Sequence, residues 1–327
     1  MTALDRLALR HDSSQKLRQI LQWWPGVKAT KKPRIGLALG SGGARGWCHI
    51  GVLRALEKMG VRPDAIAGCS MGAVVGAAYA AGRLDELEKW ARSQTRRSIM
   101  GLIDVRLTGG GVVGGAEILS MLQTIGIPDR IEDLPIPFVA VAADIQTGRE
   151  VWLREGPLAK SIRASVAIPG VFSPERIDGQ WLIDGGVVNP IPVSAARALD
   201  ADIVIAVNPD ARMNAGFWKP GMPRPTLPTW SDLLPDLPES LRNLWPASAQ
   251  REVIAPPAYL ELVLTAIDIM SEQIRRSRLA GDAPHVLLNA YLTELNVLDF
   301  HRAGEAITEG ERIVEAHAEW IRAVTAE

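Results

Sequence analysis

Between residues 34 and 208 the sequence alternates short apolar runs with runs of helical composition, and glycine-rich turns separate several of them. Short apolar runs bounded by turn residues are typical of buried strands. Strands that alternate with helices are joined by crossover connections, which arrange the strands in parallel. The sequence therefore predicts an α/β fold, with a layered architecture in which helices cover both faces of a mainly parallel central sheet.

One uncharged run, residues 65–82, is as long as a membrane span. Four glycines interrupt it and small residues dominate the rest, so we expect a buried strand, a turn and a helix here rather than a membrane helix. The other expected strands cover residues 34–39, 138–143, 150–153, 181–183, 203–207 and 285–289. The other expected helices cover residues 44–59, 117–123, 158–166, 192–199, the segment from 259 onward, and 303–324.

Charge and cysteine content limit the classes of protein to which the chain can belong. Its 327 residues include 36 Lys and Arg against 37 Asp and Glu, a formal net charge of −1. That balance excludes a polybasic nucleic-acid binder, because such a protein neutralises many phosphates. Two cysteines cannot build a disulfide framework, and residues 1–30 hold no uncharged hydrophobic stretch typical of a secretory signal. A cytoplasmic protein is therefore expected.

Two segments differ from the alternating part of the chain. Residues 1–33 carry seven basic and two acidic side chains, and their apolar residues follow the spacing of an amphipathic helix that includes Trp24. Such a helix suits either a membrane surface or packing on protein. Residues 209–258 hold ten of the 22 prolines and three of the ten tryptophans, a density that prevents a continuous helix. We expect one domain over residues 34–327, with 209–258 as an insertion or lid.

The run Gly68-Cys69-Ser70-Met71-Gly72 lies between an apolar strand-like run and a small-residue helix. A tight strand-to-helix turn forces strained backbone on its middle residue and exposes that side chain, while the flanking glycines avoid clashes. This context favours Ser70 as a nucleophile. The competing interpretation is a turn that packs a helix closely on a sheet.

A nucleophilic serine needs hydrogen-bond donors for the oxyanion that forms when it attacks a carbonyl. Residues 40–46, with the sequence Gly-Ser-Gly-Gly-Ala-Arg-Gly, follow the first expected strand and open a helix, so their backbone N–H groups suit a negative charge. A dinucleotide-binding fingerprint would need a glycine at position 45, where Arg45 stands, and a Walker lysine is absent as well. An oxyanion loop fits this segment better.

Two kinds of general base are compatible with the sequence. Asp184 ends an expected strand and precedes two glycines, which makes it a carboxylate that other backbone can approach. In an α/β-hydrolase arrangement a histidine later in the chain would act between Asp184 and the serine. The candidates are His285, His301 and His317. Ser70 comes early in the chain for that fold, and none of these histidines has a distinctive neighbourhood.

These motifs, in this order, resemble the patatin-like phospholipases, a family of serine acyl-hydrolases that use a Ser–Asp dyad. The resemblance covers residues 34–208, and beyond the three motifs it includes residues 165–170 and 189–192. It is strongest for the short bacterial members, which are also similar to the catalytic domain of neuropathy target esterase. Ser41 stands where the family usually has glycine, a departure that leaves the loop's backbone donors intact.

The resemblance implies a mechanism without metal or cofactor. Ser70 attacks an acyl ester, Asp184 accepts the serine proton, and burial raises the pKa of that carboxyl. The implied oxyanion-hole residues are Gly42, Gly43, Ala44 and Arg45, of which Arg45 braces the loop, and Gly68 and Gly72 belong to the serine turn. The implied substrate is a phospholipid or lysophospholipid at a membrane surface, from which the enzyme releases a fatty acid.

Other functions stay open on the sequence alone. A hydrolase of small soluble esters or thioesters would use the same dyad, and a membrane-associated scaffold would keep the fold with vestigial activity, although the complete motif set argues against it. Peripheral contact with the inner face of the membrane through residues 1–33 and 209–258 is expected, and assembly into homo-oligomers is compatible with the sequence. Cys48, Cys69 and His49 are expected to be packing residues.

Overall fold

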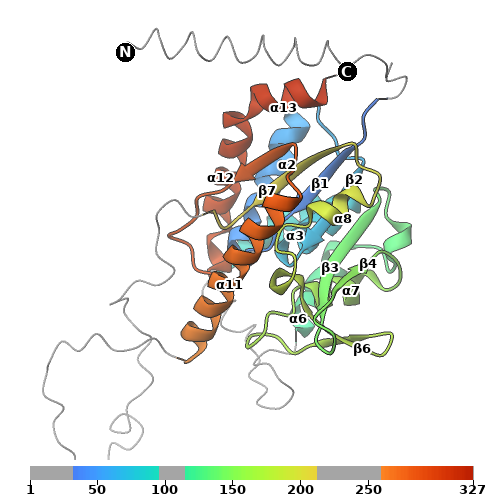
Figure 1. Ribbon diagram of the computed structural model, residues 1–327, viewed down its shortest axis with the longest axis vertical. Helices are drawn as coiled ribbons and strands as arrows, with labels where there is room; N and C mark the ends of the chain where they lie inside the picture. Colours follow the sequence, from blue (N-terminus) through green and yellow to red (C-terminus); the bar gives the residue numbers. More distant parts are fainter. Residues whose placement is uncertain (1–31, 96–114, 212–258, 327) are drawn as a thin grey trace, which may run out of the picture. The chain divides into compact units, whose positions relative to one another are not determined.

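Eight strands form one sheet in the structure, a computed structural model that describes residues 32–95, 115–211 and 259–326 (Figure 1). The parallel strands are β1 (Ile35–Leu39), β2 (Ala65–Cys69), β3 (Phe138–Asp144), β7 (Ile203–Asn208) and β8 (Val286–Asn289). The antiparallel strands are β4 (Glu150–Leu153), β5 (Glu175–Ile177) and β6 (Gln180–Asp184). The mainly parallel sheet expected from the alternation is therefore confirmed.

The neighbours of β3 change along its length, and this brings two distant chain segments together. β4 pairs with residues 140–143 of β3. β2 pairs with residues 138–141, and β6 pairs with residues 142–144. Because a strand has only two edges and β4 fills one of them, β2 and β6 must share the other edge, end to end. The carboxyl ends of β2 and β6 therefore meet beside β3.

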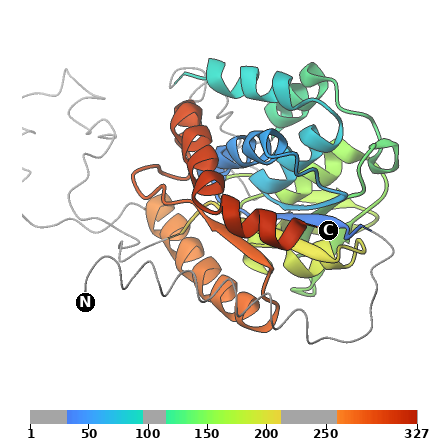
Figure 2. The ribbon, with the colours of Figure 1, turned by 90° about the horizontal axis from the view of Figure 1, so that it is seen from above.

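Helices cover both faces of the sheet, as expected (Figure 2). On one face lie α2 (Cys48–Lys58), α3 (Met71–Ala80), α4 (Leu84–Ser93), α6 (Ala116–Ile125), α7 (Leu158–Ser165), α12 (Ala303–Ala316) and α13 (Ala318–Thr325). On the other lie α8 (Val193–Arg197) and α11 (Tyr259–Gly281).

The two faces carry different cores, because side chains alternate across each strand. On β1, Leu37 and Leu39 join the large apolar core under α2, α3 and α12. Ala38, between them, points to the other face, where Ala67 and Ala206 from the neighbouring strands are equally small. Small side chains let the short α8 pack close to the sheet on that face.

Most expected elements agree with the structure within two residues, and two differ in form. The expected helix over 44–59 begins as a 3₁₀ turn, η1 (Gly43–Trp47), before α2. The expected helix over 303–324 is α12 followed by α13, because His317 has a non-helical backbone (φ −110°, ψ 10°). The structure adds α4 and β5, which the sequence analysis missed.

The uncharged run over residues 65–82 forms β2, the Ser70 turn and α3, and it is almost entirely buried. Within the three described ranges, no helix combines the length and the apolar character needed to cross a bilayer. The expected amphipathic helix in residues 1–33 and nearly all of the 209–258 segment lie outside the described residues.

Candidate active site

Ser70 occupies the turn from β2 into α3 with φ 54° and ψ −123°. A positive φ is strained for a residue with a side chain, and such strain concentrates at functional sites. Glycines permit the turn: a Cβ on Gly72 would lie 2.0 Å from the carbonyl oxygen of Leu39, and one on Gly68 would lie 2.5 Å from Cα of Ala73. Any larger residue at either position would push the turn apart.

Ser165, at the end of α7, fixes the same turn from the other side. Its Oγ accepts a hydrogen bond from the backbone N–H of Ser70 at 2.9 Å, and its hydroxyl donates to the carbonyl oxygen of Val141 at 2.6 Å. All of these groups are buried, so the pair of bonds satisfies polar atoms that water does not reach. From the sequence, no role was expected for Ser165 beyond its place in the segment 165–170.

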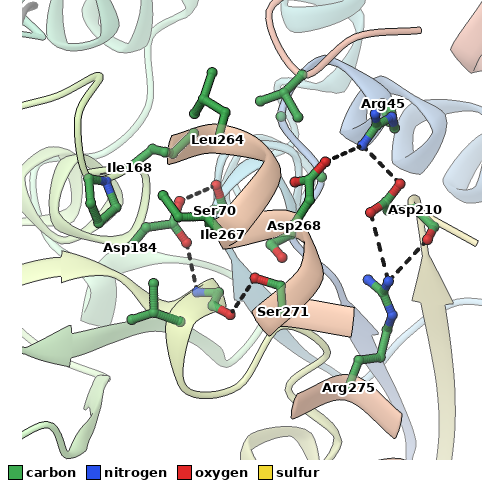
Figure 3. A pocket seen from close by; sticks show the side chains of 17 residues that line it. Arg45, Ser70, Ile168, Asp184, Asp210, Leu264, Ile267, Asp268, Ser271 and Arg275 are labelled. Carbon is green, nitrogen blue, oxygen red and sulfur yellow. Dashed lines mark hydrogen bonds and ion pairs between the residues drawn. The ribbon is translucent and has the colours of Figure 1, made fainter. Parts of the chain in front are cut away.

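Asp184 meets Ser70 where the ends of β2 and β6 abut (Figure 3). The Ser70 hydroxyl donates to Oδ2 of Asp184 at 2.6 Å. The other carboxylate oxygen, Oδ1, accepts the backbone N–H of Gly186 at 2.7 Å, so the carboxylate is held at both oxygens. Both residues are buried, at 2% and 4% exposure. They are 114 positions apart in the sequence, and the strand register brings them together.

Burial raises the pKa of Asp184 to about 6, and the hydrogen bonds from Ser70 and Gly186 limit the rise because they stabilise the ionised form. A carboxyl with this pKa is mostly ionised at neutral pH. It also holds a proton more tightly than an ordinary aspartate, which makes it a stronger base. The arrangement can therefore accept the proton of Ser70 without an intervening histidine.

The glycine loop lies beside the dyad and offers two backbone donors. Two of its N–H groups already have acceptors: the Ala44 N–H donates to the carbonyl oxygen of Val297 at 2.8 Å, and the Arg45 N–H donates to the carbonyl oxygen of Gly42 at 3.2 Å. The N–H groups of Gly42 and Gly43 have no acceptor within the described part of the chain, and both residues line the cavity at Ser70. Gly43 has φ +53°, and a Cβ there would lie 2.5 Å from the Val297 oxygen. Of the four implied oxyanion residues, only Gly42 and Gly43 thus have an N–H group without a partner among the described residues.

Arg45 connects this loop to three other segments. Its Nε donates to the carbonyl oxygen of Leu295 at 2.8 Å. Its Nη1 lies 2.8 Å from Oδ1 of Asp210, which follows β7, and 3.8 Å from Oδ2 of Asp268 on α11. With 6% of its surface exposed, Arg45 is a buried, paired cation that holds the loop in place.

A cavity of about 60 Å³ adjoins the dyad, and one of its walls is α11. A helix was expected here from the sequence, but nothing in the sequence connected it to the site. The α11 residues that line the cavity are Leu264, Ile267, Asp268, Ser271 and Arg275 (Figure 3). Ile168 and Pro169, from the segment after α7, also line it. The cavity therefore has an apolar end at Ser70 and a charged end at Arg45.

None of the four described histidines lines this cavity. His285 uses Nδ1 to accept the backbone N–H of Val204 at 2.9 Å, and Nδ1 of His317 lies 2.7 Å from the Ile313 carbonyl oxygen. The arrangement with Asp184 and a later histidine is therefore not assembled at Ser70.

The three residues expected to be packing residues are buried, as expected. His49 lies with Nε2 2.8 Å from the carbonyl oxygen of Gly40, and burial lowers its pKa to about 4, so it is neutral. Burial raises the thiol pKa of Cys48 and Cys69, which keeps both thiols protonated. The thiol of Cys69 lies 4.0 Å from Oδ1 of Asp184. It therefore leaves Oδ2, the oxygen that accepts the Ser70 hydroxyl, free of a second donor.

Comparisons with known proteins agree with the motifs. A family profile described as patatin-like phospholipase matches residues 37–197, the segment that holds both Ser70 and Asp184. An uncharacterized NTE family protein of Mycobacterium tuberculosis is 37% identical over 330 residues, which cover 88% of this chain and 92% of that protein. Patatin-like phospholipase domain-containing protein 6 of Homo sapiens is 31% identical over 284 residues, which cover 80% of this chain and 20% of that protein.

Proposed function

Because the chain belongs to the patatin-like phospholipase family and is a lipid acyl hydrolase by that membership, we propose that it cleaves fatty-acyl esters of phospholipids or lysophospholipids through an acyl-enzyme at Ser70. The observation that carries this proposal is the 2.6 Å hydrogen bond from the Ser70 hydroxyl to the buried carboxylate of Asp184. A serine on a strained turn beside a base of raised pKa is an activated nucleophile.

The first half of the reaction forms the acyl-enzyme. Ser70 Oγ attacks the ester carbonyl carbon while its proton moves to Oδ2 of Asp184. The oxygen of the tetrahedral intermediate takes up the negative charge and receives hydrogen bonds from the N–H groups of Gly42 and Gly43. When the intermediate collapses, the bond to the alcohol oxygen breaks, and Asp184 returns the proton to that leaving oxygen.

The second half releases the fatty acid. Water attacks the acyl carbon and transfers a proton to Asp184, the second tetrahedral intermediate collapses, and Ser70 recovers its proton. Since Asp184 must be ionised at the start of each half, its pKa of about 6 fits work near neutral pH. The ion pairs of Arg45 keep the two oxyanion donors in place throughout.

The test is incubation of the full chain with defined phospholipids, lysophospholipids and a bacterial lipid extract, followed by mass spectrometry of the products. We expect free fatty acid and the matching deacylated lipid from the wild type, and neither from Ser70→Ala. Ser120→Ala, which removes an exposed serine hydroxyl on α6, is the matched control and should behave like the wild type. Release of fatty acid by Ser70→Ala at the wild-type rate would contradict the proposal.

A second candidate is a hydrolase of small esters or thioesters with the same dyad. The cavity volume supports it, since about 60 Å³ is several-fold below the ~300–1,000 Å³ typical of pockets for larger ligands. Rates on p-nitrophenyl esters of increasing chain length separate the two: an optimum at acetate or butyrate with no lipid product favours the second candidate. A catalytically silent scaffold predicts no turnover of any ester.

Membrane association through residues 1–33 and 209–258 also belongs to this proposal. It is supported by the seven basic side chains and the Trp23-Trp24 pair of the first segment, because tryptophan favours the headgroup region and cations favour anionic lipid. Flotation of the full chain with anionic liposomes, compared with a variant that begins at Lys32, tests the first segment. Equal flotation of the two would exclude a membrane role for residues 1–31.

A further inference from the structure

The two sides of α11 face different surroundings. Its inner face, defined by Leu264, Ile267, Asp268, Ser271 and Arg275, lines the cavity at the dyad (Figure 3). Its outer face, defined by Leu262, Ala266, Ile269, Met270, Gln273 and Arg276, is exposed along its whole length. With 3.6 residues per turn, these two sets lie on opposite sides of the helix. α11 thus lies between the cavity at the catalytic serine and an exposed surface.

The inner face leaves too little space for a lipid. The cavity of about 60 Å³ is several-fold smaller than the ~300–1,000 Å³ pockets that hold larger ligands, so it does not hold a long acyl chain with a glycerol group. Leu264 and Ile267 occupy the region in front of Ser70 where such a chain would lie (Figure 3). Hydrolysis of a lipid at this site therefore requires a wall of the cavity to move, and α11 is the wall whose apolar side chains fill the space in front of Ser70.

The polar contacts between α11 and the rest of the site are few. The Ser271 hydroxyl donates to the carbonyl oxygen of Gly186 at 3.3 Å, and Arg275 donates to the carbonyl oxygen of Asp210 at 3.1 Å. Asp268 lies 3.8 Å from Arg45. Water can replace the Ser271 hydrogen bond at a net change of about 1 kcal/mol. Arg275 and Asp210 form a buried ion pair, which costs more to break, but Arg275 also pairs with Glu272 on α11 and Asp210 with Arg45, so each keeps a charged partner when α11 separates.

The outer face is apolar, and its exposed charge is positive. Leu262, Ile269 and Met270 are 53%, 41% and 54% exposed, although large apolar side chains are usually buried. From Leu262 to the end of α11, the only exposed charged side chains are Arg276 and Arg278, while both acidic residues of that stretch lie at the inner side or are buried. Arg276 and Arg278 pair with Glu272 and Glu150 at 2.6 and 3.1 Å, but their side chains are 66% and 42% exposed, and a guanidinium has further N–H groups to donate to lipid phosphate. An apolar strip with such arginines at one end complements the surface of an anionic bilayer.

A second pair of exposed apolar side chains lies just beyond the carboxyl end of β3. Ile145 directly follows β3 and Trp181 lies near the start of β6; they are 52% and 51% exposed and are linked by a 3.0 Å backbone hydrogen bond. The guanidinium of Arg176 lies 5.7 Å from the Trp181 ring centroid. Of the seven large hydrophobics that are exposed in the described part of the chain, five therefore belong to α11 or to the strand ends around the dyad.

We propose that the outer face of α11 binds the surface of an anionic lipid bilayer and that this binding draws α11 away from Ser70 and Asp184, opening the site to lipid. The inference rests on the proposed lipid hydrolysis, since a hydrolase of soluble esters would have no use for such a surface. Insertion of Leu262, Ile269 and Met270 among acyl chains removes their exposed area from water, which offsets the loss of the inner contacts.

The test compares two substrates in one protein. The double variant Ile269→Gln/Met270→Gln should hydrolyse p-nitrophenyl butyrate at the wild-type rate but phospholipid in anionic vesicles about tenfold or more slowly. Tyr291→Gln, which removes an equally exposed aromatic ring away from the site, is the matched control and should match the wild type on both substrates. Vesicle turnover by the double variant within twofold of wild type would contradict the proposal, as would an equal loss on both substrates.

A second measurement follows α11 directly. Met270→Cys labelled with bimane should show a blue-shifted emission when vesicles with 30% anionic lipid are added, and the same label at Tyr291→Cys should not. An unchanged Met270 signal under conditions where the protein hydrolyses the vesicles would overturn the proposal. So would a dimer in sedimentation that the double variant abolishes while vesicle turnover stays intact, because a second copy would then cover the face. If the wild type releases no fatty acid from any lipid, the proposed function itself fails, which is a distinct result.

Discussion

The wall of the site that carries Ser70 and the wall formed by α11 are held by different kinds of interaction. Around Ser70, glycines allow backbone segments to approach so closely that an added Cβ would lie 2.0–2.5 Å from its neighbours. Across the cavity, α11 makes a few polar contacts and exposes apolar side chains outward. Catalysis needs fixed distances and access needs movement, and this protein assigns the two requirements to different elements.

Among changes to the wall that carries Ser70, replacement of the base Asp184 should have the largest effect on activity. Asp184→Asn keeps the hydrogen bond to Gly186 but removes the proton acceptor, so we expect hydrolysis of any ester to fall by about 10³-fold or more. Initial rates on p-nitrophenyl butyrate and on vesicles measure it. A variant that retains near-wild-type rates on both substrates would exclude the dyad.

The same variant should be more stable than the wild type. The pKa of Asp184 rises from 3.8 to about 6 on folding, so between those pH values the native state binds more protons than the unfolded chain and stability falls as pH rises. Above pH 6 this group destabilises the fold by about 3 kcal/mol, which the neutral amide avoids. Urea unfolding at pH 8 should show a higher midpoint for Asp184→Asn, and the difference should shrink towards pH 4.

Ser165→Ala should make the Ser70 turn more mobile while leaving the reacting groups, Ser70 and Asp184, unchanged. It leaves the buried N–H of Ser70 and the carbonyl oxygen of Val141 without their partner, which costs about 1–3 kcal/mol of stability. We expect kcat to fall by about 10- to 100-fold with a similar KM, because the position of Ser70 relaxes. Ser161→Ala is the control, since that hydroxyl donates to the carbonyl oxygen of Pro157, the N-cap residue of the same helix, and makes no hydrogen bond to the Ser70 turn within the described part of the chain. Equal losses in the two variants would argue against a specific role for Ser165.

The pH profile should follow the ionised fraction of Asp184. Activity on a soluble ester is expected to rise about tenfold per pH unit below 6 and to level off above it, because only the ionised carboxylate accepts the Ser70 proton. At pH 5 the rate should thus be about one tenth of the plateau. A flat profile between pH 5 and 8 would show that another group acts as the base.

The smallest expected effect concerns the wall formed by α11. Ser271→Ala removes the hydrogen bond to Gly186, so α11 should separate more readily and vesicle hydrolysis should rise about twofold to fivefold, with little change on a soluble ester. Ser277→Ala, an exposed position on the same helix, serves as the control. A decrease in vesicle hydrolysis would instead mean that Ser271 contacts the substrate.

The sequence predicted the parts of the site that are local and sterically demanding. The Ser70 turn, the loop of Gly42 and Gly43, and Asp184 at a strand end were each visible in a few consecutive residues, because close backbone approach restricts which residues fit. The alternation of strands and helices likewise sufficed for the layered fold. The charge-rich helix α4 was missed although its buried residues, Leu84, Leu87 and Ala91, follow helical spacing.

The position of α11 could not be predicted, because its pattern runs against the usual rule. Amphipathic helices normally turn their apolar side to the core, yet here Leu262 and Met270 face outward while Asp268 and Arg275 face the cavity. Asp268 and Arg275 can face the cavity because each has a charged partner there: Arg45 lies near Asp268, and Asp210 lies near Arg275. Such partners are distant in the sequence, so no local pattern reports them.

The end-to-end arrangement of β2 and β6 along β3 has a consequence for how such enzymes can diversify. The separation of serine and aspartate is set by the register of two strands on a third, and not by the length of the chain that connects them. Insertions or deletions in the loops between residues 70 and 184 should therefore leave the reaction unaffected. A slip of β6 by a single residue would displace Asp184 by about 3.4 Å and turn its side chain to the opposite face. Selection can thus remodel the loops around the substrate freely, while the pairing of three short strands must be preserved.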